Sequence, residues 1–334
     1  MKIIVDGFGG DNAPAEVLKG CELAVKEWGV DIILTGDEKK LRTEAEKLSV
    51  SLDHMTIADA PDVIPMEAEP TSILKQYKDC SMARGMDLLA KGEGDAFVSA
   101  GSTGALTVGG TLLVKRLKGV RRPAIGTVIP SKTGCYMLMD SGANHDCRPE
   151  MLRQFGLMGS VYMNRVEGVE NPRVGLLNIG TEETKGCELQ VEAYQLMKNA
   201  KYNFTGNIEA RDVPLGGCDV CVCDGFTGNI FLKGLEGAVA LFMSELKGIF
   251  FSSLKNKLAA LAVKKDVGKL KKQFSSSEYG GALLLGVRRP VIKAHGSSNA
   301  KAFYNAIRQA RSCVEKNIIG EIEEQLSREL VEEE

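Results

Sequence analysis

The sequence predicts an α/β protein built on a doubly wound, Rossmann-like, mostly parallel β-sheet. The main observation is a unit that recurs along the chain: a short apolar run, a small polar turn rich in glycine, and a helical pattern. Glycine is frequent, with 37 residues against 10 prolines, which favours tight turns over disordered segments. The 334 residues are enough to bury a large core, and we expect one α/β domain over 1–334.

Apolar runs bounded by turn residues predict the strands of this sheet. They lie at 2–5, 31–35, 55–58, 95–99, 124–130, 135–140, 173–178, 202–204, 220–223 and 290–294. Helical patterns alternate with them, at 15–28, after 36–37, at 71–89, from 104 to 115, at 149–167, at 187–199, from 229 towards 250 and from 299 to 313. Residues 131–134 join two strands as a hairpin, and residues 277–286 are expected to form a loop.

The polar turns that follow these strands are the predicted ligand site. They begin at Asp6, Ser99, Asp140, Gly180, Asp224 and His295. Carboxyl ends of parallel strands share one edge of a sheet, and open α/β sheets bind ligands there. We therefore expect the six turns to gather at one edge.

Composition narrows the class of protein. The formal net charge is −2, so no overall positive field indicates a nucleic-acid partner. The nine cysteines follow no disulfide spacing, and residues 1–5 lead directly into a strand without a signal peptide, so we expect reduced thiols in a cytoplasmic protein. No run of about 18 apolar residues predicts a transmembrane helix. Cys218, Cys221 and Cys223 lack a second Cys/His pair, so we interpret them as buried side chains and predict no metal.

The first two polar turns have the features of an anion site. Asp6, Gly9, Gly10 and Asp11 follow the first strand, and glycines there let a ligand approach the backbone closely. Their spacing is not that of the dinucleotide-binding motif, and a capped turn is the alternative. In the second turn, Ser99, Gly101, Ser102 and Thr103 precede a helix, so that backbone N–H groups and hydroxyls converge on one point.

Asp224 and Asn229 stand where the strand 220–223 gives way to a long helix. A helix N-terminus at the end of a strand is a good place for an anion, because its N–H groups are unpaired and its dipole is positive. The alternative is an ordinary turn in which Asp224 caps the helix.

Lys185 and His295 are the candidate positive groups. Lys185 stands beside a glycine in the turn after 173–178, and His295 begins a Gly-Ser-Ser-Asn turn. Either side chain is suited to stabilise a phosphate or an oxyanion. A solvated lysine and a structural histidine are the alternatives.

A lysine-rich segment from 246 to 274 differs from the rest. Apolar residues recur at helical spacing, and the lysines among them face few acids. We expect residues 235–275 to form a projecting amphipathic helical segment. One interpretation is a helical hairpin packed on itself or on a second subunit. The other is contact with anionic lipid through Leu254, Leu258, Leu261 and Val263.

Taken together, the motifs resemble the bacterial phosphate acyltransferase (PlsX) family over nearly the whole chain. They are Asp6-x-x-Gly-Gly-Asp-x-Ala-Pro14, Ser99-Ala-Gly-x-Thr-Gly-Ala105, Gly175-Leu-Leu-Asn-Ile-Gly180 with Lys185-Gly186, Asp224-Gly-Phe-Thr-Gly-Asn229, Glu278-Tyr-Gly-Gly-Ala282 and His295-Gly-Ser-Ser298. Two departures from the family pattern are Gly7-Phe8 in the first motif and Ser102 in the second. They bear on fine specificity more than on the reaction.

The resemblance implies transfer of a fatty acyl group from acyl carrier protein to inorganic phosphate. The acyl phosphate would feed phospholipid synthesis through a downstream membrane acyltransferase. It also implies a fold like that of phosphotransacetylases and isocitrate dehydrogenases, a homodimer, peripheral contact with the membrane, and no cofactor. Alternatives are a coenzyme A-dependent phosphotransacylase of short acyl chains and a non-enzymatic scaffold that recruits partners to the membrane. An NAD- and metal-dependent dehydrogenase would need an aspartate cluster and an adenine pocket, which the sequence does not indicate.

This reaction needs no nucleophilic side chain, because phosphate itself attacks the thioester. We expect Lys185 and His295 to stabilise charge, and Asp224 and Asn229 to orient these groups. Ser99, Gly101, Ser102 and Thr103 would hold the phosphate, while Asp6 and Asp11 shape the floor of the site.

Overall fold

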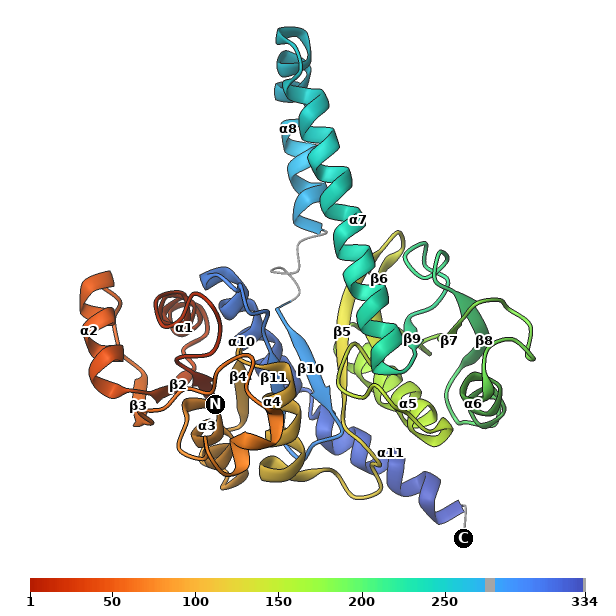
Figure 1. Cartoon of the computed structure of the whole chain (residues 1–334), viewed down its shortest axis with the longest axis horizontal. Coiled ribbons are helices and arrows are strands. Elements are labelled where there is room, and N and C mark those ends of the chain that lie inside the picture. The colour runs from red at the N-terminus through yellow and green to blue at the C-terminus, as the bar shows by residue number, and fades with distance from the viewer. Residues whose placement is uncertain (274–279, 333–334) are drawn as a thin grey trace.

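An 11-stranded β-sheet forms the core of the protein, and its strands come from nearly the whole length of the chain (Figure 1). The computed structural model describes residues 1–273 and 280–332. The strands are β1 (Lys2–Asp6), β2 (Asp31–Gly36), β3 (Met55–Asp59), β4 (Ala96–Ser99), β5 (Ala124–Ser131), β6 (Gly134–Met139), β7 (Val174–Asn178), β8 (Phe204–Glu209), β9 (Val220–Val222), β10 (Ala282–Leu285) and β11 (Val291–Lys293).

The sheet has two halves that run in opposite directions. The strand order is β3-β2-β1-β4-β11-β10-β5-β6-β9-β7-β8. Strands β1, β2, β3, β4 and β11 are mutually parallel, as are β6, β7, β8 and β9. Antiparallel pairs β11–β10, β10–β5 and β5–β6 reverse the direction three times between the halves. The predicted doubly wound, mostly parallel fold is confirmed.

Helices cover both faces of the sheet, as the apolar strands require. They are α1 (Ala15–Trp28), α2 (Glu38–Leu48), α3 (Ser81–Ala90), α4 (Thr103–Gly109), α5 (Pro149–Arg165), α6 (Glu188–Lys198), α7 (Gly225–Phe251), α8 (Leu254–Gln273), α10 (Ala300–Glu315) and α11 (Ile318–Glu332), with the 3₁₀-helix η1 (Pro70–Leu74) and the π-helical turn η2 (Gly110–Lys115). Successive side chains of β1 enter different cores. Ile3 and Val5 pack in the cluster that contains α1 and α10, whereas Ile4 packs with α3.

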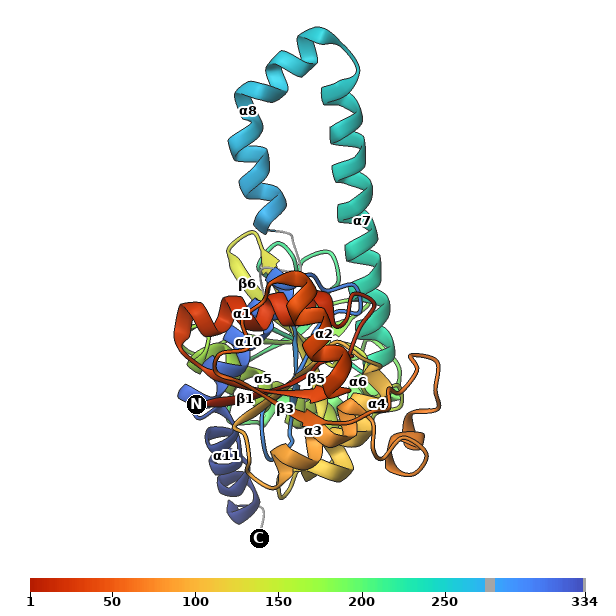
Figure 2. The ribbon, with the colours of Figure 1, turned by 90° about the vertical axis from the view of Figure 1, so that its left-hand side faces the viewer.

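Helices α7 and α8 form a hairpin that projects from the body (Figures 1 and 2). Phe231, Leu232 and Leu235 of α7 pack on the sheet beside β6 and β9. Beyond them α7 leaves the body, and α8 runs back towards it. None of the helices in the described parts of the chain combines the length and the apolar character needed to cross a membrane.

The structure corrects four sequence predictions about single elements. The helix predicted over 71–89 is interrupted, because Cys80 pairs with Asp62 in a β-bridge and starts α3 as its N-cap. Residues 282–285, predicted as loop, are the strand β10, whose Ala-Leu-Leu-Leu run is buried between two strands. The pattern from 246 is divided between α7 and α8 by a turn at 252–253. The strand predicted at 202–204 is β8, which extends to Glu209 as an edge strand.

Parts of two predicted patterns lie outside the described residues. They are Phe274 of the lysine-rich segment and Glu278-Tyr279 of the fifth motif. Their contribution stays a prediction.

Candidate active site

Three turns at the carboxyl ends of β1, β4 and β11 meet and form what we call the Asp6 cluster. Ser99 Oγ donates a hydrogen bond to Asp6 Oδ2 at 2.7 Å, and the backbone N–H of Gly101 donates to Ser99 Oγ at 3.0 Å. The third turn joins through the backbone, because Asp11 N donates to Gly296 O at 2.8 Å. The sequence-predicted residues of the first two turns are therefore brought together.

Gly9 and Gly10 allow these turns to approach each other. A Cβ at Gly9 would lie 2.7 Å from Asp6 Oδ2, 2.8 Å from Ser99 Oγ and 2.9 Å from Gly101 N. Gly10 has φ +98°, in the region that L side chains rarely adopt. The packing and backbone conformation of the cluster require glycine at both positions, independently of any ligand.

Burial raises the pKa of the Asp6 carboxyl above its ordinary value, although hydrogen bonds from Ser81 and Ser99 act in the opposite direction. The side chain is completely covered, so Asp6 holds the turns together and does not face solvent. Asp11, in contrast, is exposed.

Lys293 is the cation of the Asp6 cluster, and sequence reasoning missed it. Its Nζ donates to the carbonyl oxygen of Ala100 at 3.2 Å and also to that of Ala294. Burial lowers its pKa to about 8, while the negative charges of Asp11 and Asp6 oppose this shift and the positive charge of Lys233 adds to it. The available signal was a lysine inside an otherwise apolar strand.

Ser102 and Thr103 lie at the start of α4, directly after this cluster. Ser102 is the N-cap, and its Oγ accepts a long hydrogen bond from Ala105 N at 3.5 Å. Helix α4 continues without interruption into η2, which gives one helical segment from 103 to 115. The first turn of α4 follows directly after Gly101 of the cluster, and the binding of an anion by its backbone N–H groups stays a prediction.

His295 lies at the rim of the Asp6 cluster with its imidazole exposed. Its Nδ1 accepts a hydrogen bond from the backbone N–H of Ser297 at 3.2 Å and lies 2.9 Å from the hydroxyl of that residue. Acceptance from an N–H places the ring proton on Nε2 in the neutral form. The ring is thus held by its own turn, with Nε2 available to a ligand.

Asp224 belongs to a second cluster, at the carboxyl ends of β6 and β9, which we call the Asp140 cluster. Its Oδ1 accepts from Thr227 N at 2.8 Å, and its Oδ2 accepts from Thr227 Oγ1 at 2.7 Å. Asp224 is therefore the N-cap of α7, the alternative that the sequence left open. Its predicted role in orienting catalytic groups stays a prediction.

Asp140 organises the second cluster through five hydrogen bonds. Its carboxylate accepts from the backbone N–H groups of Ile125, Gly142, Ala143 and Asn144 and from Asn144 Nδ2, at 2.8 to 3.1 Å. Burial nevertheless raises its pKa. Its carbonyl oxygen would be 1.9 Å from a Cβ at Gly228, so the first turn of α7 lies directly against this loop.

Asn229 is exposed one turn into α7, next to Gly142 of the Asp140 cluster. Lys185 is exposed in the turn after β7, and only its backbone is held: its carbonyl oxygen accepts from Asn178 Nδ2 at 2.9 Å. The structure brings neither residue into contact with His295. Glu209 and Arg211, at the end of β8, form an ion pair on the surface at 2.8 Å.

The prediction that six polar turns share one edge is wrong. Because β6, β7 and β9 run opposite to β1, β4 and β11, the turns at Asp140, Gly180 and Asp224 leave the other edge of the sheet. The hairpin between β5 and β6 was predicted, but the sequence could not show that the short strand β10 pairs with the distant strand β5 and links the two halves.

Helix α7 is the element that connects the two clusters. It starts at the Asp140 cluster, and Lys233, about 2.5 turns beyond Asp224, is close enough to Lys293 to affect its pKa. Lys233 is exposed, and its Nζ forms an ion pair with Glu236 at 2.8 Å on the same helix. Its positive charge still contributes to the lowered pKa of Lys293.

The cysteines pack as the sequence suggested. Cys218, Cys221 and Cys223 are buried in the core beneath α7. Among the residues that the structure describes, no group of three or more His, Cys, Asp or Glu side chains has the arrangement of a metal site.

Comparison with known proteins identifies the family. The family model described as "Fatty acid synthesis protein" matches residues 1–321. The chain is similar to a phosphate acyltransferase of Clostridium novyi, with 45% identity over 332 residues that cover 99% of this chain and all of the relative. It is also similar to a phosphate acyltransferase of Acetivibrio thermocellus, with 47% identity over 97% of this chain and 96% of that one.

Solved structures agree on the fold. A phosphotransacetylase from Streptococcus pyogenes superposes with a TM-score of 0.63 over 94% of both chains at 18% identity. A phosphotransacetylase from Staphylococcus aureus gives a TM-score of 0.60 at 16% identity, over 93% of this chain and 94% of that one. Together with the near-complete match to curated relatives, the motifs along the chain establish that the protein is an acyltransferase and belongs to the bacterial phosphate acyltransferase (PlsX) family.

Proposed function

We propose that the protein transfers a fatty acyl group from acyl carrier protein to inorganic phosphate and releases an acyl phosphate. The observation that carries the proposal is the position of Lys293 in the Asp6 cluster. Its partly buried Nζ donates to the carbonyl oxygen of Ala100 at 3.2 Å, in the turn that leads to the N-cap of α4 at Ser102. A dianion is the ligand that such an arrangement favours.

The proposed chemistry has one attack and one departure. A phosphate oxygen attacks the thioester carbonyl carbon, the C–S bond of the tetrahedral intermediate then breaks, and the thiol carrier leaves as thiolate. A free thiol has a pKa of about 8.5, so this leaving group needs little help from an acid. The protein contributes position and charge. It holds phosphate beside the carbonyl carbon and stabilises the oxyanion, for which one donor contributes roughly 3 kcal/mol.

The geometry divides the proposed roles between the two clusters. Lys293, with Ser102 and Thr103, holds phosphate. His295 lies at the rim of the same cluster, and its Nε2–H is the donor for the oxyanion. Lys185 and Asn229 belong to the other edge of the sheet, where they are exposed, so their proposed contacts are with the acyl donor.

The hairpin supports a proposed contact with anionic membrane. Leu254, Leu258, Leu261 and Val263 have exposed fractions of 77%, 62%, 67% and 39%. Large apolar side chains rarely stay so exposed without a partner. Lys255, Lys257, Lys264 and Lys265 of α8 are exposed and add attraction to anionic lipid, at about 1 kcal/mol for each residue near the surface.

A groove of about 780 Å³ separates α7 from α8 and supports a proposed homodimer. Met243, Leu246, Phe250 and Val267 contribute apolar surface to its walls. We propose that the stem of the hairpin packs against a second copy while its tip contacts lipid. A peripheral position in the cytoplasm would bring the reactive product to a membrane acyltransferase of phospholipid synthesis.

The test is phosphate-dependent formation of acyl phosphate from a long-chain acyl carrier protein thioester. We expect acyl phosphate, trapped as the hydroxamate, only when both substrates are present. A preference for acyl coenzyme A with short chains would replace the proposal by a phosphotransacylase of a different donor. No phosphate-dependent loss of either thioester would leave a non-enzymatic scaffold.

A further inference from the structure

A strongly basic surface lies at the edge of the sheet that carries the Asp140 cluster. We define this basic surface as the five basic residues of the segment 115–122 (Lys-Arg-Leu-Lys-Gly-Val-Arg-Arg) together with Arg148, Arg288 and Arg289. All eight side chains are exposed. The protein as a whole has a formal net charge of −2, so this local excess of positive charge is a specific feature.

Two copies of one short sequence build the surface. Gly-Val-Arg-Arg-Pro occurs at 119–123, before β5, and again at 286–290, before β11. The fold places these segments side by side. Arg116 pairs with Val287 in an antiparallel bridge, and Arg288 N donates to Lys115 O at 2.9 Å. Residues about 170 positions apart along the chain therefore share one surface.

The positive charges of this surface have no acidic partners within the described ranges 1–273 and 280–332. Apart from these residues, many exposed lysines and arginines form ion pairs, whereas none of the eight does. Arg116, Arg121, Arg122 and Arg148 line a hollow of about 410 Å³, and Asp146 is the one acid in its lining. Like charges at this density repel one another, and an anionic partner removes that cost.

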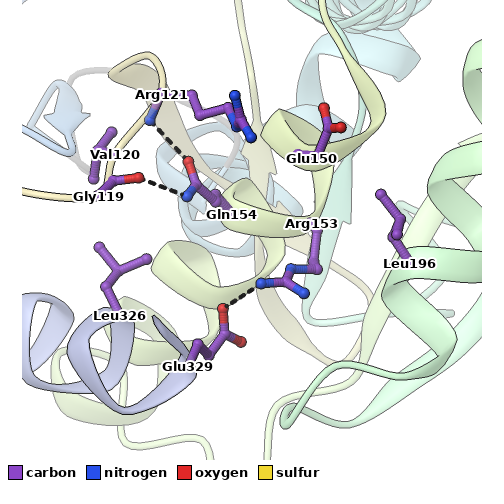
Figure 3. Close-up of a pocket in the computed structure, with 9 residues that line it drawn as sticks. All are labelled: Gly119, Val120, Arg121, Glu150, Arg153, Gln154, Leu196, Leu326 and Glu329. Atoms are coloured by element: carbon purple, nitrogen blue, oxygen red, sulfur yellow. Dashed lines mark hydrogen bonds and ion pairs between the residues drawn. The ribbon is translucent and has the colours of Figure 1, made fainter. Parts of the chain in front are cut away.

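The backbone under the surface is fixed before any partner binds. Gln154 of α5 accepts a hydrogen bond from Arg121 N at 3.0 Å and donates one to Gly119 O at 2.9 Å (Figure 3). The guanidinium of Arg116 donates to the carbonyl oxygens of Val120 and Arg121. A preordered loop loses less conformational entropy on binding than a flexible one.

The position of the surface relates it to the site and separates it from the hairpin. Asn144 Nδ2, in the Asp140 cluster, donates to Pro123 O at 2.8 Å, so the surface borders the start of α7. Strand β10 begins on the side of the hairpin and runs away from it, which places Gly286–Pro290 at the far side (Figure 1). A membrane at the tip of the hairpin would leave the basic surface facing away from the lipid.

We propose that the basic surface is the docking site of the acidic carrier protein that delivers the acyl group. This inference rests on the proposed function, because it assigns the partner of the same reaction. Acyl carrier proteins are small and acidic, and complementary charge guides such encounters. From this docking site a thioester arm passes the Asp140 cluster and follows α7 towards Lys233 and Lys293. The surface contains no aromatic side chain for stacking on bases, which disfavours a nucleic acid.

The test is the double variant Arg288→Glu/Arg289→Glu, which lies away from the proposed reacting groups. The matched control is Lys39→Glu/Lys40→Glu on the exposed face of α2, with the same change of charge. We expect kcat/KM for the carrier-bound acyl donor to fall about ten-fold or more in the first variant, through KM, and to lose much of its salt dependence. With the same acyl group on pantetheine, which is uncharged, both variants should equal the wild type.

Direct binding of fluorescent holo-carrier, measured by anisotropy, separates the two proposals. If the wild type forms no acyl phosphate from either donor, the proposed function fails. The docking surface is still supported in that case if the Arg288/Arg289 variant loses carrier binding and the Lys39/Lys40 control does not. Equal carrier binding by wild type and variant would overturn it. So would equal losses with both donors, or a selective loss of binding to anionic vesicles, which would assign the surface to lipid.

Discussion

Replacement of Lys293 by methionine tests the central group of the proposed site. Methionine retains most of the length of the side chain and removes the charge. The Nζ group donates to two carbonyl oxygens in a partly buried position, and its pKa is lowered to about 8 from 10.5. This difference corresponds to about 3 kcal/mol by which burial disfavours the charged form. The charged lysine therefore lowers the free energy of unfolding, and we attribute its presence to a role in function.

The pH dependence of stability gives the sign of this effect. Below pH 8 the lysine is protonated in both the folded and the unfolded chain, and the full cost is present. Between pH 8 and 10.5 only the unfolded chain keeps the proton, so the free energy of unfolding of the wild type rises with pH. We expect Lys293→Met to lack this rise, which amounts to about 3 kcal/mol.

Urea unfolding of both proteins at pH 7 and pH 10 measures the difference. Loss of the two hydrogen bonds offsets part of the gain at pH 7, at about 1 kcal/mol each, so the variant should be equal to or more stable than the wild type there. At pH 10 that advantage should be smaller or reversed. A constant difference between the two proteins at both pH values would refute the lowered pKa.

Lys293→Met should lower activity although it does not lower stability at pH 7. Loss of a preorganised positive charge at the phosphate should reduce kcat/KM about 100-fold. For the wild type, kcat/KM should fall above about pH 8, as the lysine loses its charge. Lys233→Met serves as a control, because removal of the neighbouring positive charge should move this fall to higher pH. Near-normal turnover of Lys293→Met at pH 7 would show that Lys293 does not bind phosphate in the reaction.

Three further predictions concern other parts of the molecule. Lys185→Ala and His295→Ala should each lower turnover of the carrier-bound donor at least ten-fold in a steady-state assay, and near wild-type rates in both would reject these assignments. Gly9→Ala should lower the free energy of unfolding by about 2 kcal/mol or more in a urea titration, since the added methyl would lie 2.7 Å from a carboxylate oxygen. The control Gly248→Ala, with open space around it, should be neutral or slightly stabilising in the same titration. Leu258→Glu should weaken cosedimentation with anionic liposomes, and equal binding by variant and wild type would exclude lipid contact through this face of α8.

Local signals were enough to predict most elements of the fold. Helix α1 and strands β1 and β2 have nearly the predicted bounds, because periodicity and flanking turns define them without distant contacts. The elements that were missed depend on tertiary contacts. Strand β10 has four residues and becomes a strand because β5 and β11 pair with both of its edges.

The sequence also determined which turns carry polar groups, the family, and the residues that the first two turns contribute to the Asp6 cluster. Asp6, Gly9 and Ser99 were recognisable because glycines and small hydroxyl side chains at the end of a strand have few other uses. Lys293 was not recognisable, since one lysine in a short strand has no periodic signature. Its importance comes from the burial of its Nζ group, which is a property of the folded molecule.

Only the tertiary structure decided which turns lie together. Each turn has the same local pattern, a strand followed by glycine, a polar group and a helix, so the sequence treats all six alike. Three antiparallel pairings in the middle of the sheet reverse its second half and send Asp140, Gly180 and Asp224 to the other edge. The direction of a strand is set by its hydrogen-bonded neighbours, and the pairing that joins the two halves, between β5 and β10, links residues more than 150 positions apart along the chain.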